Sequence, residues 1–435
     1  MSGLSLSEIS VLLNEKVVPG IQNYLNANSS FNKRFRKSTR PFESGRYWRI
    51  PLQTGRNAQF GATSDTGELP YHGKPSFNEY RVYPKRAYIQ FQVDGATLDF
   101  AGNNAEGMTN ILEQILKDCR NEVNFQYNRM FFGTGSGRLA IVCTNYSAGT
   151  PTIIDVGVGE TATDGGWDMA KNLRADQILS VQEGDSATVR GQVTIASISH
   201  WSGSGTKKSV ITCVGNAPAA MVAGDVLVHG LQNSGCSYGQ EAMGLLGHID
   251  NGTRVETYQN ISSRSSHPWA CAKVFANSGT LRDLTIPLMQ QAKDSREFRT
   301  NKTRNDKMII LMNTSMLYEY SKFSQPGTRF VPGGTKDVGM PDRELITFDG
   351  KEIVTETGNP YHKIFFLDES DFEVFEQLPF RFEDRDGSVL QRDASATANK
   401  HTFTGFGYDV LNSACNNPMS QTSLEDINQD CIAPE

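Results

Sequence analysis

Hydrophobic and polar residues alternate in two segments of the chain that flank one long polar stretch. Every second position is apolar from 48 to 52 and again from 87 to 93, which is the period of a strand with one buried face. The two segments are predicted to pair as one long hairpin. Its connection, from about Gln53 to Ser76, contains the glycine-rich stretch from Gly55 to Pro70 and far exceeds the loop of an ordinary hairpin. Because an isolated hairpin is marginal in water, we expect this one to lie on other protein.

A helical period follows the hairpin. Apolar side chains recur every three or four residues from Ala105 to Phe132, at Met108, Ile111, Leu112, Ile115, Leu116, Cys119 and Val123. The pattern predicts a long amphipathic helix with one buried stripe. The sequence GTGSG, from Gly133 to Gly137, is predicted to end this helix, because glycine accepts the left-handed backbone that follows a helix.

Beyond the helix the pattern changes twice. Short segments rich in Val, Ile and Thr, separated by Gly, Asp and Asn turns, predict a small all-β unit over residues 139–231. Helix and strand patterns then mix, which predicts an α+β region with a short buried sheet and helices against it. Its predicted elements are a helix from Thr285 with Pro287 in its first turn, the strand Met308 to Met312, a helix through Leu317 and Tyr320, a hairpin turning at Asp349-Gly350, and a strand from Lys363.

Composition places the 435-residue chain among ordinary globular proteins, with 38% hydrophobic and 21% charged residues. No run reaches the roughly 18 apolar residues of a membrane span, and the N-terminus lacks the pattern of a signal peptide. Seven cysteines without a CxxC pair argue against both a disulfide framework and a zinc site. The net charge of −6 argues against a large phosphate-binding surface.

The charge is unevenly distributed along the chain. Before the hairpin, a capping box at Ser5 and Glu8 and a helix interrupted near Pro19-Gly20 lead into a polar arm. The segment from Lys33 to Arg49 contains seven lysines and arginines and only one acidic residue, Glu43, and six of the seven cations precede the hairpin strand. Acidic residues gather later in the chain, in DESDFEVFE from Asp368 to Glu376. These runs are either solvated faces or patches that attract one another between copies of the chain.

Four features of the sequence resemble known chemical sites. The match to G-x-S-x-G around Ser237 needs a strand before it and a helix after it, but the following segment is broken by glycine. GSGTKKS has Thr206 where a phosphate loop requires glycine, and GTGSG follows a helix rather than a strand. The seven histidines show no HExxH spacing. The motifs therefore predict no catalytic, cofactor or metal site.

The order of these parts resembles a major capsid protein of a tailed bacteriophage, with the HK97-like fold. The resemblance lies in the basic arm, the hairpin with IPLQTGRNAQFGATSDTGELP, the helix end QILKDCRNEVNFQYNRMFFGTGSG, the β-rich insertion, and the region ending in KIFFLDESDF. It implies an α+β fold with an N-terminal arm (1–45), an extended loop (46–95), a peripheral domain with the spine helix (96–138), an inserted β-rich domain (139–231), a mainly axial domain (232–370), and return strands of the peripheral domain with a C-terminal tail (371–435).

The resemblance also implies a structural protein rather than an enzyme. Such a protein assembles into the pentamers and hexamers of an icosahedral virion head that encloses double-stranded DNA, and it lies in the host cytoplasm during assembly. Its partners would be other copies of itself, with portal, scaffolding and cement proteins, and DNA only non-specifically; no membrane and no cofactor are implied. The candidate inter-subunit contacts are Arg34, Arg36, Lys37, Arg56, Asp65, Glu68, Asp368, Glu369 and Asp371.

Three alternatives stay open from the sequence. An encapsulin-type nanocompartment shell would share the fold and differ in its cargo. A serine hydrolase using Ser237 would react with a fluorophosphonate probe. An extracellular β-rich adhesin is disfavoured because no signal peptide is evident, and native disulfides would revive it.

Overall fold

The computed structural model describes residues 34–43, 45–94, 105–147, 153–157, 173–184, 186, 188–199, 209–231, 235–300, 307–324, 347–356, 358–384, 390–392 and 402–428. Over these residues the chain folds as four sheets with helices packed on them, an α+β arrangement as predicted. The capping box at Ser5 and Glu8, the helix expected around Pro19-Gly20 and the segment 203–208 of GSGTKKS lie outside the described residues.

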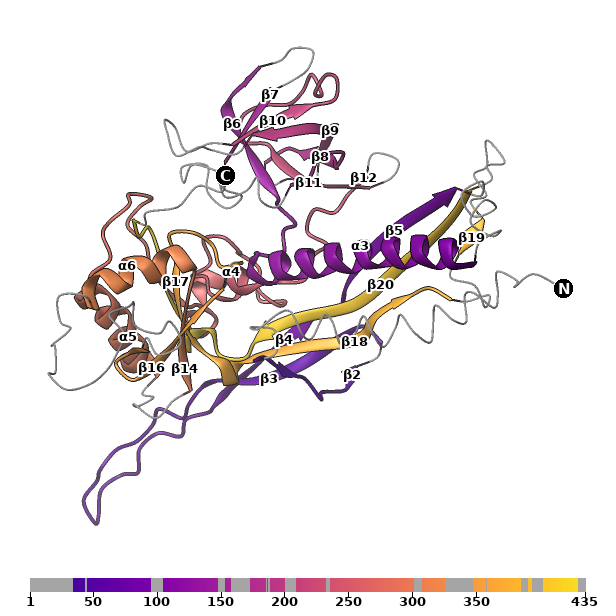
Figure 1. Cartoon of the computed structure of the whole chain (residues 1–435). Helices are drawn as coiled ribbons and strands as arrows, with labels where there is room; N and C mark the ends of the chain where they lie inside the picture. The colour runs from indigo at the N-terminus through magenta and orange to yellow at the C-terminus, as the bar shows by residue number, and fades with distance from the viewer. Residues whose placement is uncertain are drawn as a thin grey trace, which may run out of the picture.

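A long sheet and one long helix form the elongated part of the molecule (Figure 1). Strand β20 (Thr402–Cys415) lies between β18 (Phe372–Phe382) and β5 (Lys85–Asp94) and is antiparallel to both. Helix α3 (Ala105–Phe132) has the predicted bounds and runs along one face of this sheet. Their shared core consists of Phe91, Val93, Leu116, Cys119, Val123, Phe380, Phe382 and Leu390. Short strands β1 (Arg36–Lys37) and β19 (Gln391–Arg392) pair with β18 and β20.

The predicted pairing of residues 48–52 with residues 87–93 is wrong. Strand β3 (Tyr47–Gly55) pairs instead with β4 (Ser76–Val82), and β2 (Phe42–Glu43) adds a third strand. Residues 87–93 belong to β5, which pairs with β20 because its apolar face, with Phe91 and Val93, is buried under α3. The chain leaves the hairpin at Tyr83-Pro84, between β4 and β5, where proline has no N–H to donate.

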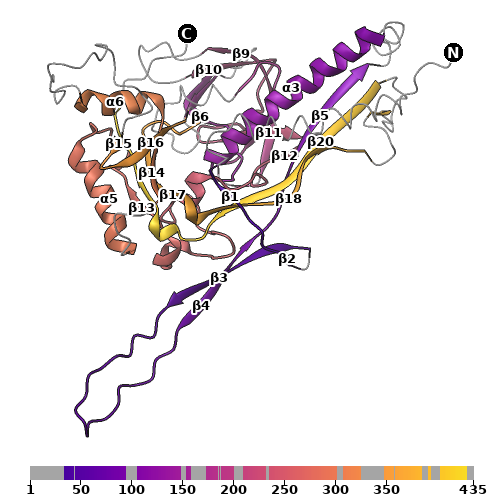
Figure 2. The same cartoon turned by 60° about the horizontal axis from the view of Figure 1, so that its bottom comes forward.

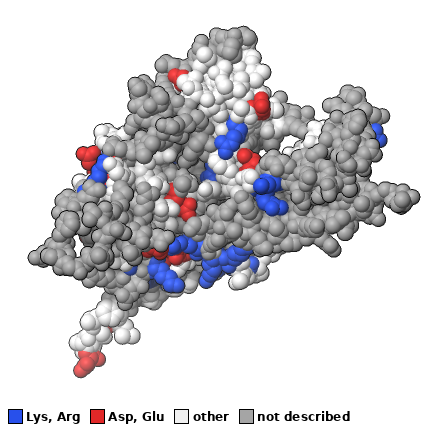
Figure 3. Space-filling view, in the orientation of Figure 1, with Lys and Arg blue, Asp and Glu red and all other residues white. Residues whose placement is uncertain are grey.

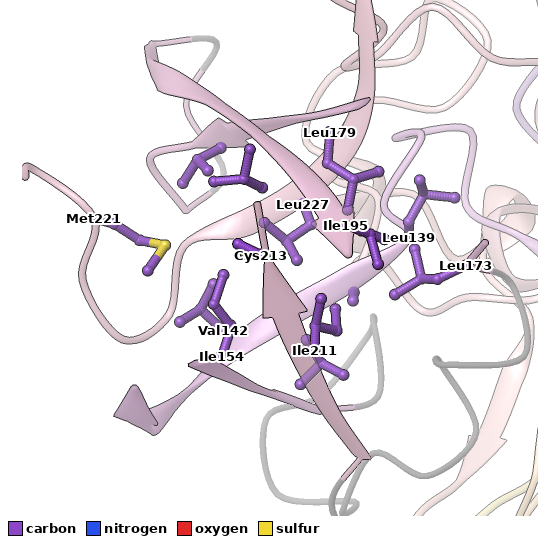
Figure 4. Close-up of a cluster of buried hydrophobic side chains, with 14 residues drawn as sticks. Leu139, Val142, Ile154, Leu173, Leu179, Ile195, Ile211, Cys213, Met221 and Leu227 are labelled. Atoms are coloured by element: carbon purple, nitrogen blue, oxygen red, sulfur yellow. The ribbon is translucent and has the colours of Figure 1, made fainter. Parts of the chain in front are cut away.

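The segment predicted to be all-β forms a closed barrel. Among its described residues, seven strands lie in the order β12-β11-β6-β7-β10-β9-β8, and β11 pairs with both β6 and β8, which closes the sheet on itself. The strands are β6 (Ala140–Ser147), β7 (Ile153–Gly157), β8 (Ile178–Gln182), β9 (Val189–Ser199), β10 (Ser209–Cys213), β11 (Val226–Leu231) and β12 (Gly235–Cys236). Figure 4 shows side chains such as Leu179, Ile211 and Leu227 gathered in its interior, so the barrel has its own core.

The described residues of the α+β region form a six-stranded sheet whose central strands are buried on both faces. Its order is β13 (Lys273–Phe275), β21 (Thr422–Leu424), β17 (Ile364–Asp368), β14 (Met308–Met312), β16 (Lys351–Thr355) and β15 (Thr347–Phe348). In β14, Ile310 packs with helices α5 (Ile286–Thr300) and α6 (Thr314–Ser324), and Ile309 packs toward α4 (Leu245–His248). The predicted strands and helices of this region are confirmed, and β21 joins them from the C-terminal segment. Single-turn helices are η3 (Arg264–Ser266), η4 (Pro268–Ala270), η7 (Glu369–Asp371) and η8 (Pro418–Ser420).

The predicted turn at Asp349-Gly350 gives a first test. Both residues have positive φ, 49° and 72°, as a tight hairpin turn between β15 and β16 requires. Gly350→Ala is expected to lower the free energy of unfolding by about 1 kcal/mol, because alanine disfavours this backbone. Gly350→Asn is the control, since asparagine tolerates the left-handed region, and it should lower the free energy of unfolding less than Gly350→Ala does. Urea unfolding followed by circular dichroism measures both; equal losses would contradict the explanation.

Candidate subunit interface

The end of the hairpin projects from the body of the molecule (Figure 2). Residues 56–75, which join β3 to β4, are almost all exposed. Large apolar side chains lie in this connection and at the start of β4 with little cover from their own chain: Phe60 (94% exposed), Leu69 (85%) and Tyr71 (86%) in the connection, and Phe77 (71%) in β4. An exposed apolar cluster on a projecting element is typical of a protein interaction surface. We call these four residues the tip cluster.

The base of the same hairpin is firmly packed. Trp48, Ile50, Tyr80 and Val82 are buried together with Tyr258, and the rings of Tyr80 and Tyr258 meet edge to face at a centroid distance of 5.3 Å. Alternate positions of β3 and β4 therefore hold the hairpin root against the body. A hairpin anchored in this way presents its tip cluster in a defined direction.

Arg56, Asp65 and Glu68 lie in this exposed connection, as predicted. Among the described residues, no ion pair or side-chain hydrogen bond engages any of the three. Figure 3 shows acidic side chains at the far end of the projecting hairpin, and Lys and Arg side chains gathered on the body near its base. Their contact with a neighbouring copy stays a prediction.

The basic arm meets late carboxylates within its own chain. Arg34 pairs with Glu369 at 2.9 Å and also with Glu352, while Lys37 pairs with Glu376 at 2.6 Å. This follows from the parallel pairing of β1 with β18, which brings the arm to the edge of the long sheet. The sequence had suggested such attraction between copies; contact of these charges with another copy stays a prediction.

Glu373 is the centre of this arrangement, which we call the arm clasp. Its buried carboxylate accepts hydrogen bonds from Arg36 and from Arg40, the latter at 3.1 Å, and from Asn416 at 3.0 Å. Burial opposes ionisation of Glu373, but these donors outweigh it and lower its pKa. The carboxylate therefore stays charged and holds the arm.

The clasp gives a prediction with a defined pH dependence. Glu373→Gln is expected to cost about 1 to 3 kcal/mol of stability at pH 7, because charge-assisted hydrogen bonds are lost. Since the folded pKa is lowered, this contribution is fully present above the unfolded pKa of about 4.3 and is lost as the pH falls from there through the lower folded pKa. Glu376→Gln, which removes a more exposed pair, should change stability less. Thermal unfolding of the purified chain in steps from pH 7 to about pH 3 measures the difference between the two variants; a loss for Glu373→Gln that stays constant over the whole series would contradict the prediction.

The other two predicted acids have local partners. Asp368 is 2% exposed; it accepts a hydrogen bond from Arg296 at 3.2 Å and caps η7 through the backbone of Ser370. Asp371 accepts a hydrogen bond from Gln421 at 3.1 Å. Of the three acids predicted in this segment, the structure brings Glu369 to the arm.

A buried polar network, absent from the sequence predictions, lies beside the hairpin root. Arg264 is fully buried and donates to the backbone carbonyls of Ala270, Gly247 and His248 at 2.6 to 2.7 Å, with its guanidinium 4.3 Å from the ring centre of Tyr258. His248 lies between the hydroxyls of Tyr258 (2.9 Å) and Ser413 (2.8 Å), and burial lowers its pKa to about 3. The network ties residues 247–270 to β20 and supports the hairpin root.

Ser237 does not have the surroundings of a nucleophile. Its Oγ donates to the backbone carbonyl of His229 at 3.2 Å, whereas the His229 ring lies within hydrogen-bond distance of Gln177 (3.2 Å) and Gln126 (3.1 Å). The preceding strand β12 has two residues, and the next helix, α4, begins eight residues later. A nucleophile elbow needs a sharp strand-to-helix turn and an imidazole within reach.

In the part of the chain that the structure describes, no three His, Cys, Asp or Glu residues gather as metal ligands. None of the described helices combines the length and the apolar character needed to cross a membrane.

Comparison with known proteins gives structural similarity at low sequence identity. No family model and no curated protein matches the chain. Among solved structures it is similar to the capsid of cyanophage A-1(L), over 91% of both chains, with 13% identity and a TM-score of 0.45. It is also similar to the capsid of a native GTA particle, over 92% of this chain and 90% of that chain, with 9% identity and a TM-score of 0.44. A third similar structure is the capsid of the Myoviridae phage XM1, over 91% of this chain and 90% of that chain, with 6% identity and a TM-score of 0.45. All three are capsid structures.

Proposed function

We propose that this chain is the major capsid protein of a tailed bacteriophage, and that its copies form the pentamers and hexamers of an icosahedral head around double-stranded DNA. The observation that carries the proposal is the anchored hairpin with its exposed tip cluster. Apolar side chains on an element that its own chain does not cover need a second protein to bury them. In a shell built from one chain, that protein is the neighbouring copy.

The domain map follows the same proposal. In an HK97-like subunit, the arm would be the N-arm and the hairpin the extended loop. The long sheet with α3 would be the peripheral domain, the barrel the inserted domain, and the six-stranded sheet the axial domain. Many weak contacts of this kind, repeated around a closed shell, add up through effective concentration. Arg56, Asp65 and Glu68 would contribute polar contacts beside the tip cluster, and the exposed arm residues Arg36 and Lys37 would face the next subunit.

Partners and location follow from the role. Portal, scaffolding and cement proteins are proposed as partners, with the head as the final location and the host cytoplasm as the place of assembly. The net charge of −6 supports a wall that packaged DNA touches only non-specifically. The local partners of Ser237 support a structural role rather than catalysis.

The test is negative-stain electron microscopy of the purified chain with sedimentation velocity. Closed shells, tubes, or rings of five or six subunits are expected, alone or with the co-expressed scaffolding protein. Nuclease-protected DNA in particles from infected cells would separate a phage head from a nanocompartment, which encloses protein cargo. A homogeneous monomer under both conditions, with Ser237 labelled by a fluorophosphonate, would overturn the proposal.

A further inference from the structure

A cavity of about 1030 Å³ lies between α3, strands β5 and β20, and the barrel. Its wall includes Val123 and Met130 of α3, Ile89 of β5 and Leu411 of β20, so much of it is apolar. The volume is at the upper end of small-molecule sites, which are roughly 300 to 1000 Å³. The cavity therefore has the size and lining of a ligand site.

One buried carboxyl group on this wall has an oxygen atom without a hydrogen-bond partner among the described residues. Asp409 is 1% exposed, and its Oδ1 accepts a hydrogen bond from the backbone N–H of Ala87 at 3.2 Å. Its Oδ2 is buried with no hydrogen-bond partner among the described residues. Asp409 is paired with Ala87 across the sheet, on the face turned toward α3. Tyr127 of α3 also lies on the wall, and its buried hydroxyl has no hydrogen-bond partner among the described residues either.

The other charges on the wall are engaged or exposed. Lys85 donates to the carbonyl of Gly239 at 2.7 Å, and Arg129 pairs with Glu241. From α3, Glu122 accepts a hydrogen bond from Gln126 at 2.7 Å, and from the barrel side the guanidinium of Arg174 lies 4.5 Å from the ring centre of Phe125. Arg86 and Asp176 are exposed, and burial lowers the pKa of His229, which keeps it neutral. Asp409 is thus the buried wall carboxyl with an unused acceptor atom.

We propose that this cavity binds an aliphatic amine, with the ammonium group donating to Asp409 Oδ2 and the methylene chain lying along the apolar wall. An ammonium group supplies both the donor and the charge that a buried carboxylate lacks. The alkyl body matches Val123, Met130 and Leu411. The amine is either a free diamine or a lysine side chain of a neighbouring copy; the first source does not depend on the capsid proposal.

Isothermal titration of unassembled subunits with 1,5-diaminopentane tests the site. At pH 8 the wild-type chain is expected to bind one molecule, and 1-pentanol, which has the same carbon chain without the charge, should bind at least tenfold more weakly. Burial raises the pKa of Asp409 to about 7, so the carboxyl is mostly protonated at pH 6. Affinity for the diamine should therefore fall about tenfold from pH 8 to pH 6.

Two variants complete the test. Asp409→Asn should keep the fold, because the asparagine side chain has nearly the same shape as the aspartate that it replaces. This variant should bind the diamine at least tenfold more weakly than wild type. Glu122→Gln, on the same wall but already hydrogen-bonded, should bind like wild type. If diamine binding persists in assembled shells, the natural ligand is a free amine. If diamine binding is lost on assembly, the site is occupied by a lysine side chain of a neighbouring copy. No binding by wild type, or equal binding by Asp409→Asn, would overturn the proposal.

Discussion

Serine at the four positions of the tip cluster is expected to abolish shell formation while leaving the subunit folded. Phe60, Leu69, Tyr71 and Phe77 make little contact with their own chain, so their loss should change the free energy of unfolding by less than about 0.5 kcal/mol. In an assembly each would bury most of its apolar surface, worth about 1.5 to 3 kcal/mol for each large side chain. Negative-stain electron microscopy and sedimentation velocity measure assembly, and circular dichroism measures the fold.

The matched control lies in the same loop. Gln59 and His72 are also exposed but polar, and replacing both with serine should leave assembly unchanged. If the tip-cluster variant still forms shells at the same protein concentration as wild type, burial of these four side chains is not needed for assembly. If both variants fail to assemble, the cause is the loop backbone rather than apolar burial.

Arg264→Met is expected to cause the largest loss of stability among the single substitutions considered for this chain, about 3 to 5 kcal/mol. The variant leaves three buried carbonyls without their charged donor and removes one of the two cations near the Asp250 carboxylate, which keeps Arg254 at 3.8 Å. Urea unfolding of unassembled subunits measures the loss. Proteolysis between β3 and β4 should also become faster, because the network supports the hairpin root through Tyr258.

Two further variants separate charge from geometry. Arg264→Lys keeps the charge but has no planar fork, so it should recover only part of the stability. Arg56→Met removes an exposed arginine and should change stability by less than about 0.5 kcal/mol. Equal stability of wild type and Arg264→Met would show that the buried network does not hold this region.

Local patterns in the sequence were enough for many elements. Helix α3 was predicted with its observed bounds because the apolar period stops at glycine. The left-handed backbone expected after the helix occurs at Gly135 and Gly137, with φ of 82° and 81°, and not at Gly133, which directly follows the helix. The turn at Asp349-Gly350 and strand β14 were found for similar reasons, since each is defined by a few adjacent residues.

Pairing between distant segments could not be predicted in the same way. An alternating strand such as β5 has the same pattern whether it pairs with β3 or with β20, and the choice depends on the helix that covers Phe91. The sequence named Arg34 and Glu369 as opposite charges, but their contact within one chain depends on β1 lying beside β18. The network around Arg264 had no signal, because a buried arginine bonded to carbonyls has no sequence motif.

The closure of the barrel makes it a replaceable module. The chain enters it at Arg138 and leaves it near Ser237, and the two connecting segments are tied where Gly239 N–H donates to Ser136 O at 2.7 Å. Two chain ends this close can be joined by a short glycine linker, or can carry a different domain, with little disturbance of α3. In evolutionary terms, a subunit could gain, lose or exchange this domain in one recombination step while its long helix and sheets stayed the same.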